Sequence, residues 1–393
     1  AFTETALESI ILPMSRLIDA VSRVYLEHNS YTGVFNSYSV EIDELVSRAY
    51  EEMACFLGSG DSGEIIIGPN ATSLTYQLTR NLAHLFGPGD EIIVTHMDHE
   101  GNISPWLQLA EDTGATIRWL SFNRDTWRIE QDDLTLLLNE HTKLLALNYV
   151  SNLTGAINEV EALTKLAKAA GALVFIDGVQ YVPHHLVDVS TMGCDFFACS
   201  PYKFFGPHLG TIWGRRSVLE QCRTYKVRTA SDNLPQRFIV GVPPFELLSG
   251  LLGMIEYFEM LGRLAGDSGD KRSLISSAYG LVETHEKQLS EFLLGELNAI
   301  PEIQMLGPGQ ASDNRMRAPI FSFTHTGNKL GTLAKTFADN SIFCHWGRKF
   351  TNEAANFLKT SPTEGFIRIG ITHYSTVSEI DVMLECLRTS LYR

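Results

Sequence analysis

The chain has 393 residues, of which 44% are hydrophobic and 20% are charged, and its formal net charge at pH 7 is −15. This is the composition of a globular protein large enough to form two domains. The acidic balance argues against a nucleic-acid-binding protein, whose contact surface would be basic. No apolar run approaches the length of a membrane span and no secretory signal opens the chain, so we expect a cytoplasmic protein without a membrane partner.

The use of cysteine agrees with that expectation. The chain has six cysteines, and none of them forms a C-x-x-C pair. In a chain of this length they do not build a disulfide scaffold, so we expect reduced thiols and no bound metal. The six are Cys55, Cys194, Cys199, Cys222, Cys344 and Cys386.

Two helices are expected before the first strand. Apolar residues recur at helical spacing over Thr5–Glu27, which predicts an amphipathic helix that is broken or kinked at Pro13. A second helix is expected over 41–57, and Gly58 ends it.

Strand and helix patterns then alternate up to residue 178. Short strands rich in Val, Ile and Leu are separated by helices, which predicts a parallel sheet covered by helices on both faces. The expected strands are 64–68, 91–95, 115–120, 143–150 and 172–178. The expected helices between them are 70–86, 104–114, 131–139 and 158–171. Two more strands are expected at 195–200 and 210–214.

The pattern changes after about residue 250, where longer helices and a second group of strands predict a smaller α+β domain. The expected helices are 247–264, 273–297, 332–339 and one that begins after Ser378. The expected strands are 303–307, 319–325, 341–347 and 365–371. We therefore expect an α/β protein with a large domain over 15–255 and a small domain formed by 1–14 and 256–393.

The loops at the carboxyl ends of the strands are the candidate functional segments, because ligands bind there in doubly wound sheets. In GPNATS, Asn70 and Thr72 lie where a strand ends and a helix begins. Unpaired backbone N–H groups at such a helix start bind anions, although an ordinary N-cap explains the same residues. The chain has neither G-x-x-x-x-G-K-[ST] nor G-x-G-x-x-G, which argues against a nucleotide phosphate.

Two other loops carry polar residues of interest. Asp177 ends a buried strand, where a carboxylate needs a cation or hydrogen-bond donors, and Gln180 is placed to reach the same ligand. A structural aspartate that accepts from loop amides is the alternative. In HMDHEGN, His96 and His99 are either hydrogen-bonded loop histidines or a means of stacking on a planar ligand.

Lys203 lies among aromatic residues in SPYKFFGPHLG. An amine of ordinary pKa, about 10.4, is inert, but burial or a nearby cation lowers the pKa and makes it a nucleophile towards carbonyls. A lysine that extends its head to water is the alternative. In the company of an anion site, a histidine and a strand-end aspartate, Lys203 is suited to a Schiff base with pyridoxal 5′-phosphate. The phosphate would lie at the helix start and the pyridinium nitrogen would pair with Asp177.

These motifs resemble those of a known family, the class V aminotransferase group of fold-type I pyridoxal-phosphate enzymes. The chain is most similar to the cysteine desulfurases and selenocysteine lyases, and in particular to the divergent cysteine desulfurase-like branch. DFFACSPYKFFGPHLG resembles the family's lysine motif, and the similarity runs from SVEIDELVSRAYEEMACFLG to FIRIGITHYSTVSEID. The resemblance implies the fold-type I architecture, a small-molecule amino-acid substrate, and a homodimer whose active site lies between the subunits.

The resemblance also implies roles for single residues. Lys203 would form the Schiff base, Asp177 would pair with the pyridinium nitrogen, and His99 would stack on the ring; these three are the expected catalytic residues. Arg368 would clamp the substrate carboxylate, aided by Asn152. The residues expected to contact the cofactor are Ala71, Thr72, His99, Asn152, Asp177, Gln180, Ser200, Tyr202 and Lys203.

The chain departs from the family pattern at several positions. Tyr202 precedes the lysine where the family has histidine, and Val242 replaces a threonine whose hydroxyl reaches the neighbouring subunit's phosphate. The position at which the family has its sulfur-accepting cysteine is occupied by Phe350. Cys344 lies on an expected strand, and we expect its side chain to serve packing. The residues expected to shape the substrate pocket are Tyr31, Phe35, His345, Trp346 and Phe350.

These residues lead to an expected reaction. Arg368 would fix the substrate carboxylate, and the Lys203 amine would remove or deliver the α-proton. Because no cysteine occupies the acceptor position, elimination at a carbon–sulfur or carbon–selenium bond is the preferred hypothesis. Racemisation or epimerisation and transamination are the alternatives. An inactive cofactor-binding scaffold is disfavoured, because the residues that such chemistry needs are intact.

Overall fold

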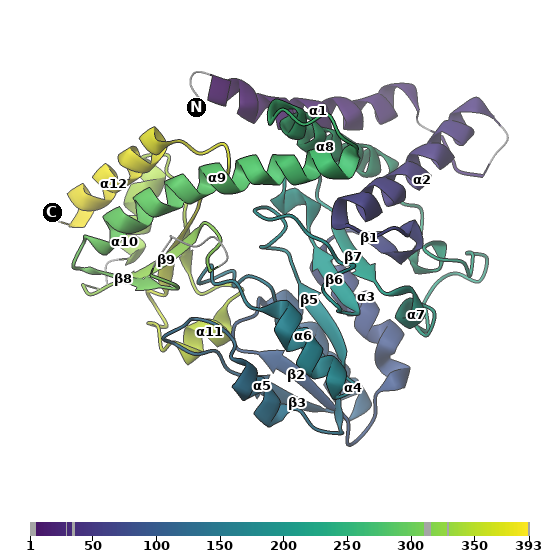
Figure 1. The fold of residues 1–393 in the computed structure, drawn as a ribbon, viewed down its shortest axis with the longest axis horizontal. Helices are drawn as coiled ribbons and strands as arrows, with labels where there is room; N and C mark the ends of the chain where they lie inside the picture. Colours follow the sequence, from purple (N-terminus) through teal and green to yellow (C-terminus); the bar gives the residue numbers. More distant parts are fainter. Residues whose placement is uncertain (1–4, 29, 34–35, 310–315, 328–329, 392–393) are drawn as a thin grey trace.

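Seven strands form one large sheet in the order β1-β7-β6-β5-β4-β2-β3 (Figure 1). The computed structural model describes residues 5–28, 30–33, 36–309, 316–327 and 330–391, with side chains from residue 15 onward. β7 is antiparallel to both of its neighbours, and all other neighbours in the sheet are parallel, so the expectation of a mainly parallel sheet is confirmed. The strands are β1 (Ile65–Gly68), β2 (Glu91–Thr95), β3 (Thr116–Leu120), β4 (Thr142–Asn148), β5 (Leu173–Asp177), β6 (Phe196–Cys199) and β7 (Gly210–Gly214).

Helices cover this sheet, as the alternating pattern predicts. The central strands β4, β5 and β6 are almost fully buried, which explains their unbroken apolar character. The connecting helices are α3 (Ala71–Leu82), α4 (Ser104–Thr113), α5 (Gln131–Leu137) and α6 (Val160–Ala169), and the short helix α7 (Arg216–Leu219) follows β7. Single-turn 3₁₀ helices in this part of the chain include η2 (Ala83–Leu85), η3 (Glu100–Asn102) and η4 (Pro201–Lys203).

A second, antiparallel sheet has the order β10-β11-β9-β8 and lies at the opposite side of the molecule from α7 (Figure 1). It encloses a separate hydrophobic core with the helices around it. Its strands are β8 (Ile303–Leu306), β9 (Ile320–His325), β10 (His345–Gly347) and β11 (Phe366–Gly370). The helices of this part are α10 (Leu330–Asp339), α11 (Asn352–Phe357) and α12 (Val377–Leu391).

Four long helices lie along one edge of the molecule (Figure 1). They are α1 (Thr5–Glu27), α2 (Ser37–Leu57), α8 (Phe245–Leu264) and α9 (Lys271–Asn298). Two of them, α8 and α9, lead in the chain from the large sheet to the small one. α1 is one continuous helix, so it does not break at Pro13, and the alternative of a kink at that residue stays a prediction. The proposed domain limits at 14/15 and 255/256 lie inside α1 and α8, and that division stays a prediction.

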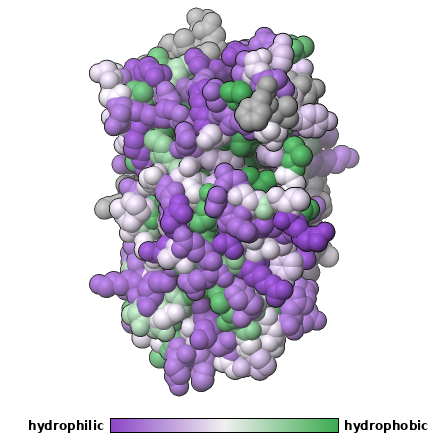
Figure 2. Space-filling view, turned by 90° about the vertical axis from the view of Figure 1, so that its right-hand side faces the viewer, coloured by the Kyte–Doolittle hydropathy of each residue, from purple (hydrophilic) through white to green (hydrophobic). Residues whose placement is uncertain are grey.

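Figure 2 shows the side of the molecule that carries α2 and α7. Hydrophobic residues on this face form small groups among hydrophilic ones rather than one continuous area. Within the described residues, no helix combines the length and the apolar character needed to span a membrane.

Candidate active site

One cavity lies at the carboxyl ends of β4, β5 and β6, against the amino end of α3. All nine residues that we expected to contact a cofactor line it, together with Asn70, Gly101 and Asn148, which we had not singled out as cofactor contacts. They come from five loops far apart in the sequence, which the order of the strands brings to one edge of the sheet. Sheet topology therefore assembles the cavity, and the cofactor contacts themselves stay predictions. The nine are Ala71, Thr72, His99, Asn152, Asp177, Gln180, Ser200, Tyr202 and Lys203.

The amino end of α3 forms one wall of the cavity. The backbone of Asn70 is extended, and this residue caps the helix because its side chain accepts from the backbone N–H of Ser73 at 2.8 Å. The first N–H groups, those of Ala71 and Thr72, have no partner within the helix, so they can bind an anion. A Cβ on Gly210 would lie 2.3 Å from the backbone nitrogen of Ala71. Only glycine at this position lets β7 approach the helix start so closely.

Asp177 lies at the end of β5, in register with Asn148 of β4 and Ala198 of β6. Its Oδ1 accepts from the backbone N–H of Val179 at 2.9 Å. Burial raises the pKa of its carboxyl to about 6, against the opposing influences of that N–H and of Lys203. A desolvated carboxylate at this position is suited to a ligand carrying a positive charge.

Lys203 ends the single turn η4, which begins at Pro201. Its backbone N–H donates to the carbonyl of Ser200 at 2.8 Å, so the turn fixes its direction. Burial lowers the pKa of the amine, and the Arg368 guanidinium lowers it further, while Asp177 opposes both. A lysine whose pKa is lowered in this way is better able to attack a carbonyl group.

His99 faces the same cavity from the loop after β2. Its Nδ1 accepts from the backbone N–H of Gly101 at 2.8 Å, which places the proton of the neutral ring on Nε2. Burial lowers the pKa of His99 to about 4, and the charges of Lys203 and Arg368 act in the same direction. The ring is therefore a neutral, planar group at physiological pH.

The second histidine of this loop, His96, lies elsewhere. Its ring stacks on Trp119 at 4.8 Å and on Phe357 at 5.5 Å between centroids. It does not line the cavity, so of the two candidates only His99 is placed for a ligand.

A second cavity, of about 400 Å³, continues from Gln180 and Lys203 to Arg368. Arg368 Nη1 donates to the carbonyl oxygen of Asn152 at 2.5 Å, which orients the guanidinium. The Oδ1 atom of Asn152 is buried and has no hydrogen-bond partner, so it is available to a donor on a ligand. Backbone pairing of β10 with β11 places His345 opposite Arg368.

Other expected pocket residues lie differently. Tyr31 is 78% exposed and lines neither cavity, and Phe35 lies outside the described residues. Trp346 is also exposed, and its indole N–H donates to the carbonyl of Glu364. Phe350 stacks on His99 and lines neither cavity.

Cys344 lines the second cavity but precedes β10, so the expectation that it lies on the strand is wrong. Burial raises the pKa of its thiol, which makes it a poorer nucleophile. Among the described residues, no group of three or more His, Cys, Asp or Glu side chains is placed to hold a metal ion.

The sequence matches the model of the family described as aminotransferase class-V over residues 12–383. The aminotransferase-like protein FGM3 of Gibberella zeae is 28% identical over 96% of this chain and 90% of its own length. A probable cysteine desulfurase of Streptomyces coelicolor is 30% identical over 95% of this chain and 88% of its own. The solved structure of a cysteine desulfurase from Thermococcus onnurineus has a TM-score of 0.85 at 23% identity, covering 96% of this chain and 91% of that one.

Proposed function

The chain belongs to the aminotransferase class-V family, and from this premise we propose that it is a pyridoxal-phosphate-dependent lyase that acts on an amino acid. The proposed reaction removes a sulfur or selenium substituent from the β-carbon without transferring it to a cysteine of the protein. We further propose that Lys203 carries the cofactor.

The residues present fit this cofactor. The unpaired N–H groups at the start of α3 suit its phosphate, with the hydroxyls of Thr72 and Ser200 in the same cavity. Asp177 suits its protonated ring nitrogen, and a bound cation would lower the raised pKa of that carboxyl. The unpartnered Oδ1 of Asn152 can accept from the ring hydroxyl.

The chain's own residues divide the work of the reaction. Arg368 binds the substrate carboxylate through the N–H groups that Asn152 leaves available. The Lys203 amine takes the α-proton, for which its lowered pKa is suited. His99 covers the reacting centre with a neutral ring and keeps water away. When bound, the cofactor accepts the electron pair left at the α-carbon, and the β-substituent can then depart.

The observation that carries the choice of elimination is the surroundings of the thiols. Of the six cysteines, only Cys344 is among the residues that line the two cavities, and the pKa of its thiol is raised. The position expected to hold an acceptor cysteine carries Phe350, whose ring stacks on His99. Elimination needs only a base, which Lys203 would supply, and a leaving group, which the substrate carries. It therefore requires no thiol of the protein.

The test is to incubate the cofactor-loaded protein with L-cysteine and with L-cystine and to identify the products. Sulfide or a persulfide released together with pyruvate supports the proposal. Alanine formed from L-cysteine, with sulfide released when dithiothreitol is added as reductant, would contradict it, and Cys344→Ala would then show whether that thiol is the acceptor. Exchange of the α-proton with solvent without release of sulfur would instead indicate an epimerase. A protein that turns yellow with cofactor but forms no product and exchanges no α-proton would indicate an inactive cofactor-binding scaffold, and one that stays colourless with added cofactor would refute the proposal.

We also propose that the enzyme is a homodimer whose subunits share the site. Val242, in the loop before α8, is 77% exposed, and Tyr202 at the cofactor cavity is 41% exposed. Three more hydrophobic residues of the same chain region are about half exposed in one subunit, namely Tyr225, Val227 and Val240. Exposed apolar residues concentrated in one segment indicate a surface that another chain covers.

A further inference from the structure

We propose that Phe350 is a positioning residue that holds the His99 ring against the cofactor cavity. This inference rests on the proposed function, since it gives His99 a cofactor to face. It concerns a contact between the part of the chain that carries the small sheet and the loop after β2.

Two contacts join Phe350 to this loop. The rings of Phe350 and His99 are stacked, with 5.2 Å between centroids and 25° between planes. The backbone carbonyl of Phe350 accepts from the N–H of Glu100, the residue that follows His99, at 3.2 Å. The ring and the backbone of one residue therefore fix both the side chain and the main chain at the histidine.

The phenyl ring stacks on one face of the His99 imidazole, and His99 lines the cavity whereas Phe350 does not. The Nζ atom of Lys349 lies 4.9 Å from the centroid of the same phenyl ring. The phenyl ring is half exposed, so it is not part of the buried core around the cavity. In the proposed arrangement the opposite face of the imidazole is the one that meets a planar ligand.

The backbone at Phe350 supports a functional role. Its φ is +67°, in the left-handed region that residues with a side chain adopt at a cost of about 1 kcal/mol or more. A glycine would adopt this conformation without that cost, but it would remove the stacked ring. Strain of this kind persists where the surrounding structure imposes it, and here the Glu100 hydrogen bond and the ring stack do so.

Covering the outer face of His99 also keeps its ring neutral. Burial is the main cause of its low pKa, and the charged groups that act on it are Lys203 of η4 and Arg368 of β11. Removing the phenyl ring hydrates the imidazole, so its pKa rises towards the ordinary value of 6.5. An imidazolium would then face a positively charged cofactor ring below about pH 6, and the cofactor would be held less tightly.

The experiment compares Phe350→Ala with a matched control, Phe357→Ala. Phe357 stacks on His96, which lies in the same loop as His99, so the control removes the same kind of contact from a histidine outside the cavity. Histidine-labelled full-length protein without cofactor is titrated by NMR, with His99→Gln and His96→Gln variants to assign the signals. We expect Phe350→Ala to raise the pKa of His99 by about two pH units and to leave the pKa of His96 unchanged, and Phe357→Ala to raise the pKa of His96 and leave that of His99 unchanged.

A second measurement follows release of pyridoxal phosphate after dilution of the loaded protein. We expect release from Phe350→Ala to be about tenfold faster at pH 5.5 and less affected at pH 8, and Phe350→Tyr to restore it to within about twofold. An unchanged His99 pKa in both Phe350→Ala and Phe350→Leu would overturn the proposal. A raised pKa with unchanged cofactor release would also overturn it. A wild type that binds no cofactor would refute the proposed function, while the titration would still decide whether Phe350 holds the ring.

Discussion

Asp177 lies at the end of β5, where burial raises the pKa of its carboxyl to about 6. Without a bound cation, ionising this group costs free energy in the folded protein. The protonated carboxyl of Asp177 therefore favours the folded state. This contribution to the free energy of unfolding is complete below the ordinary pKa of 3.8 and is lost as the pH rises through about 6. In the cofactor-free protein this carboxyl is therefore a source of instability at neutral pH that a positively charged ligand removes.

The first prediction is that Asp177→Asn stabilises the cofactor-free protein at pH 7.5. The amide is uncharged and its oxygen can still accept from Val179, so the free energy of unfolding should rise by up to about 3 kcal/mol. The gain should shrink below pH 6 and vanish near pH 4, as measured by urea unfolding of both proteins across this range. Asp232→Asn, at a fully exposed carboxyl, is the control and should show no gain of this size. A gain that persists at pH 4 would show that its origin is not ionisation.

The second prediction concerns the fork of Arg368. A lysine can keep the single bond to the Asn152 carbonyl, but it cannot also present two parallel N–H groups to a carboxylate. Arg368→Lys should therefore raise KM for the amino acid about 10- to 100-fold, with a smaller change in kcat. Arg348→Lys, on a residue that bonds Asn356 and does not line the cavities, should leave KM within about twofold. Equal effects of the two substitutions on KM would contradict the assignment of Arg368.

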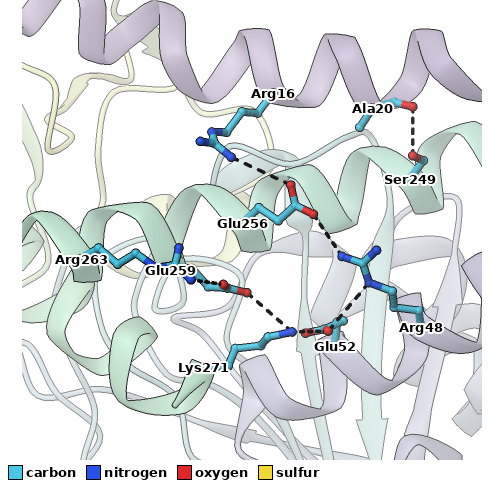
Figure 3. Close-up of polar contacts among 9 residues, drawn as sticks. All are labelled: Arg16, Ala20, Arg48, Glu52, Ser249, Glu256, Glu259, Arg263 and Lys271. Carbon is cyan, nitrogen blue, oxygen red and sulfur yellow. Dashed lines mark hydrogen bonds and ion pairs between the residues drawn. The ribbon is translucent and has the colours of Figure 1, made fainter. Parts of the chain in front are cut away.

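Among the elements, the contact of α1 with α8 depends on packing more than on charge. Figure 3 shows Glu256 of α8 between Arg16 of α1 and Arg48 of α2. Side chains of these pairs are 41–54% exposed, so each pair contributes no more than about 1 kcal/mol. A Cβ on Gly253 of α8 would lie 3.0 Å from the Arg16 carbonyl and 3.3 Å from the Ala20 Cβ, so glycine sets the distance between the helices.

The third prediction is that Gly253→Leu destabilises the protein more than Glu256→Gln does. The larger side chain should cost about 1–3 kcal/mol by forcing α1 away, whereas loss of the ion pairs should cost under about 1 kcal/mol. Gly280→Leu in α9 is the matched control, because nothing lies within 4 Å of its added Cβ and leucine is the better helix former. Thermal unfolding and the rate of tryptic cleavage in α1 measure the effects. Similar losses for Gly253→Leu and Gly280→Leu would show that helix packing is not the cause.

Periodicity predicted the elements well where the pattern is local. The limits of α1 agree with its apolar spacing, and the expected strands of the large sheet are all present. The direction of β7 could not be predicted in this way, because it depends on the tight turn through η4 that reverses the chain after β6. β10 begins only at His345, since the preceding residues, although apolar, pair with no neighbouring strand.

The loops that form the candidate site could also be predicted from the sequence, whereas one contact within it could not. Each loop signal was weak alone, yet the loops meet because parallel strands end at one edge of a sheet. The stack of Phe350 on His99 joins residues about 250 positions apart and follows from a left-handed turn at a phenylalanine. Nothing in the local sequence signals such a turn, since the residues that favour it are Gly, Asn and Asp.

For the whole molecule, the net charge of −15 bears on assembly. Two copies repel one another at low ionic strength, and salt screens that repulsion. Apolar contacts between the exposed residues around Val242 would not weaken when salt screens the charges. The proposed dimer should therefore tighten, rather than loosen, as salt rises from about 20 mM to 200 mM, where the screening length falls below about 10 Å.

The fourth prediction uses one substitution to test both the interface and the shared site. Val242→Asp adds a buried negative charge to each side of the proposed interface, so the dimer should dissociate at least about a hundredfold more readily in sedimentation experiments. Val382→Asp on α12, at a residue that is 57% exposed, adds the same charge elsewhere and should leave the dimer intact. Because the anion site at the start of α3 would lose its neighbouring subunit, the Val242→Asp variant should also release pyridoxal phosphate faster than the wild type. High salt should not restore the slower release. A Val242→Asp dimer as tight as that of Val382→Asp would place the interface on another face, and the Val242 loop would then be no part of the site.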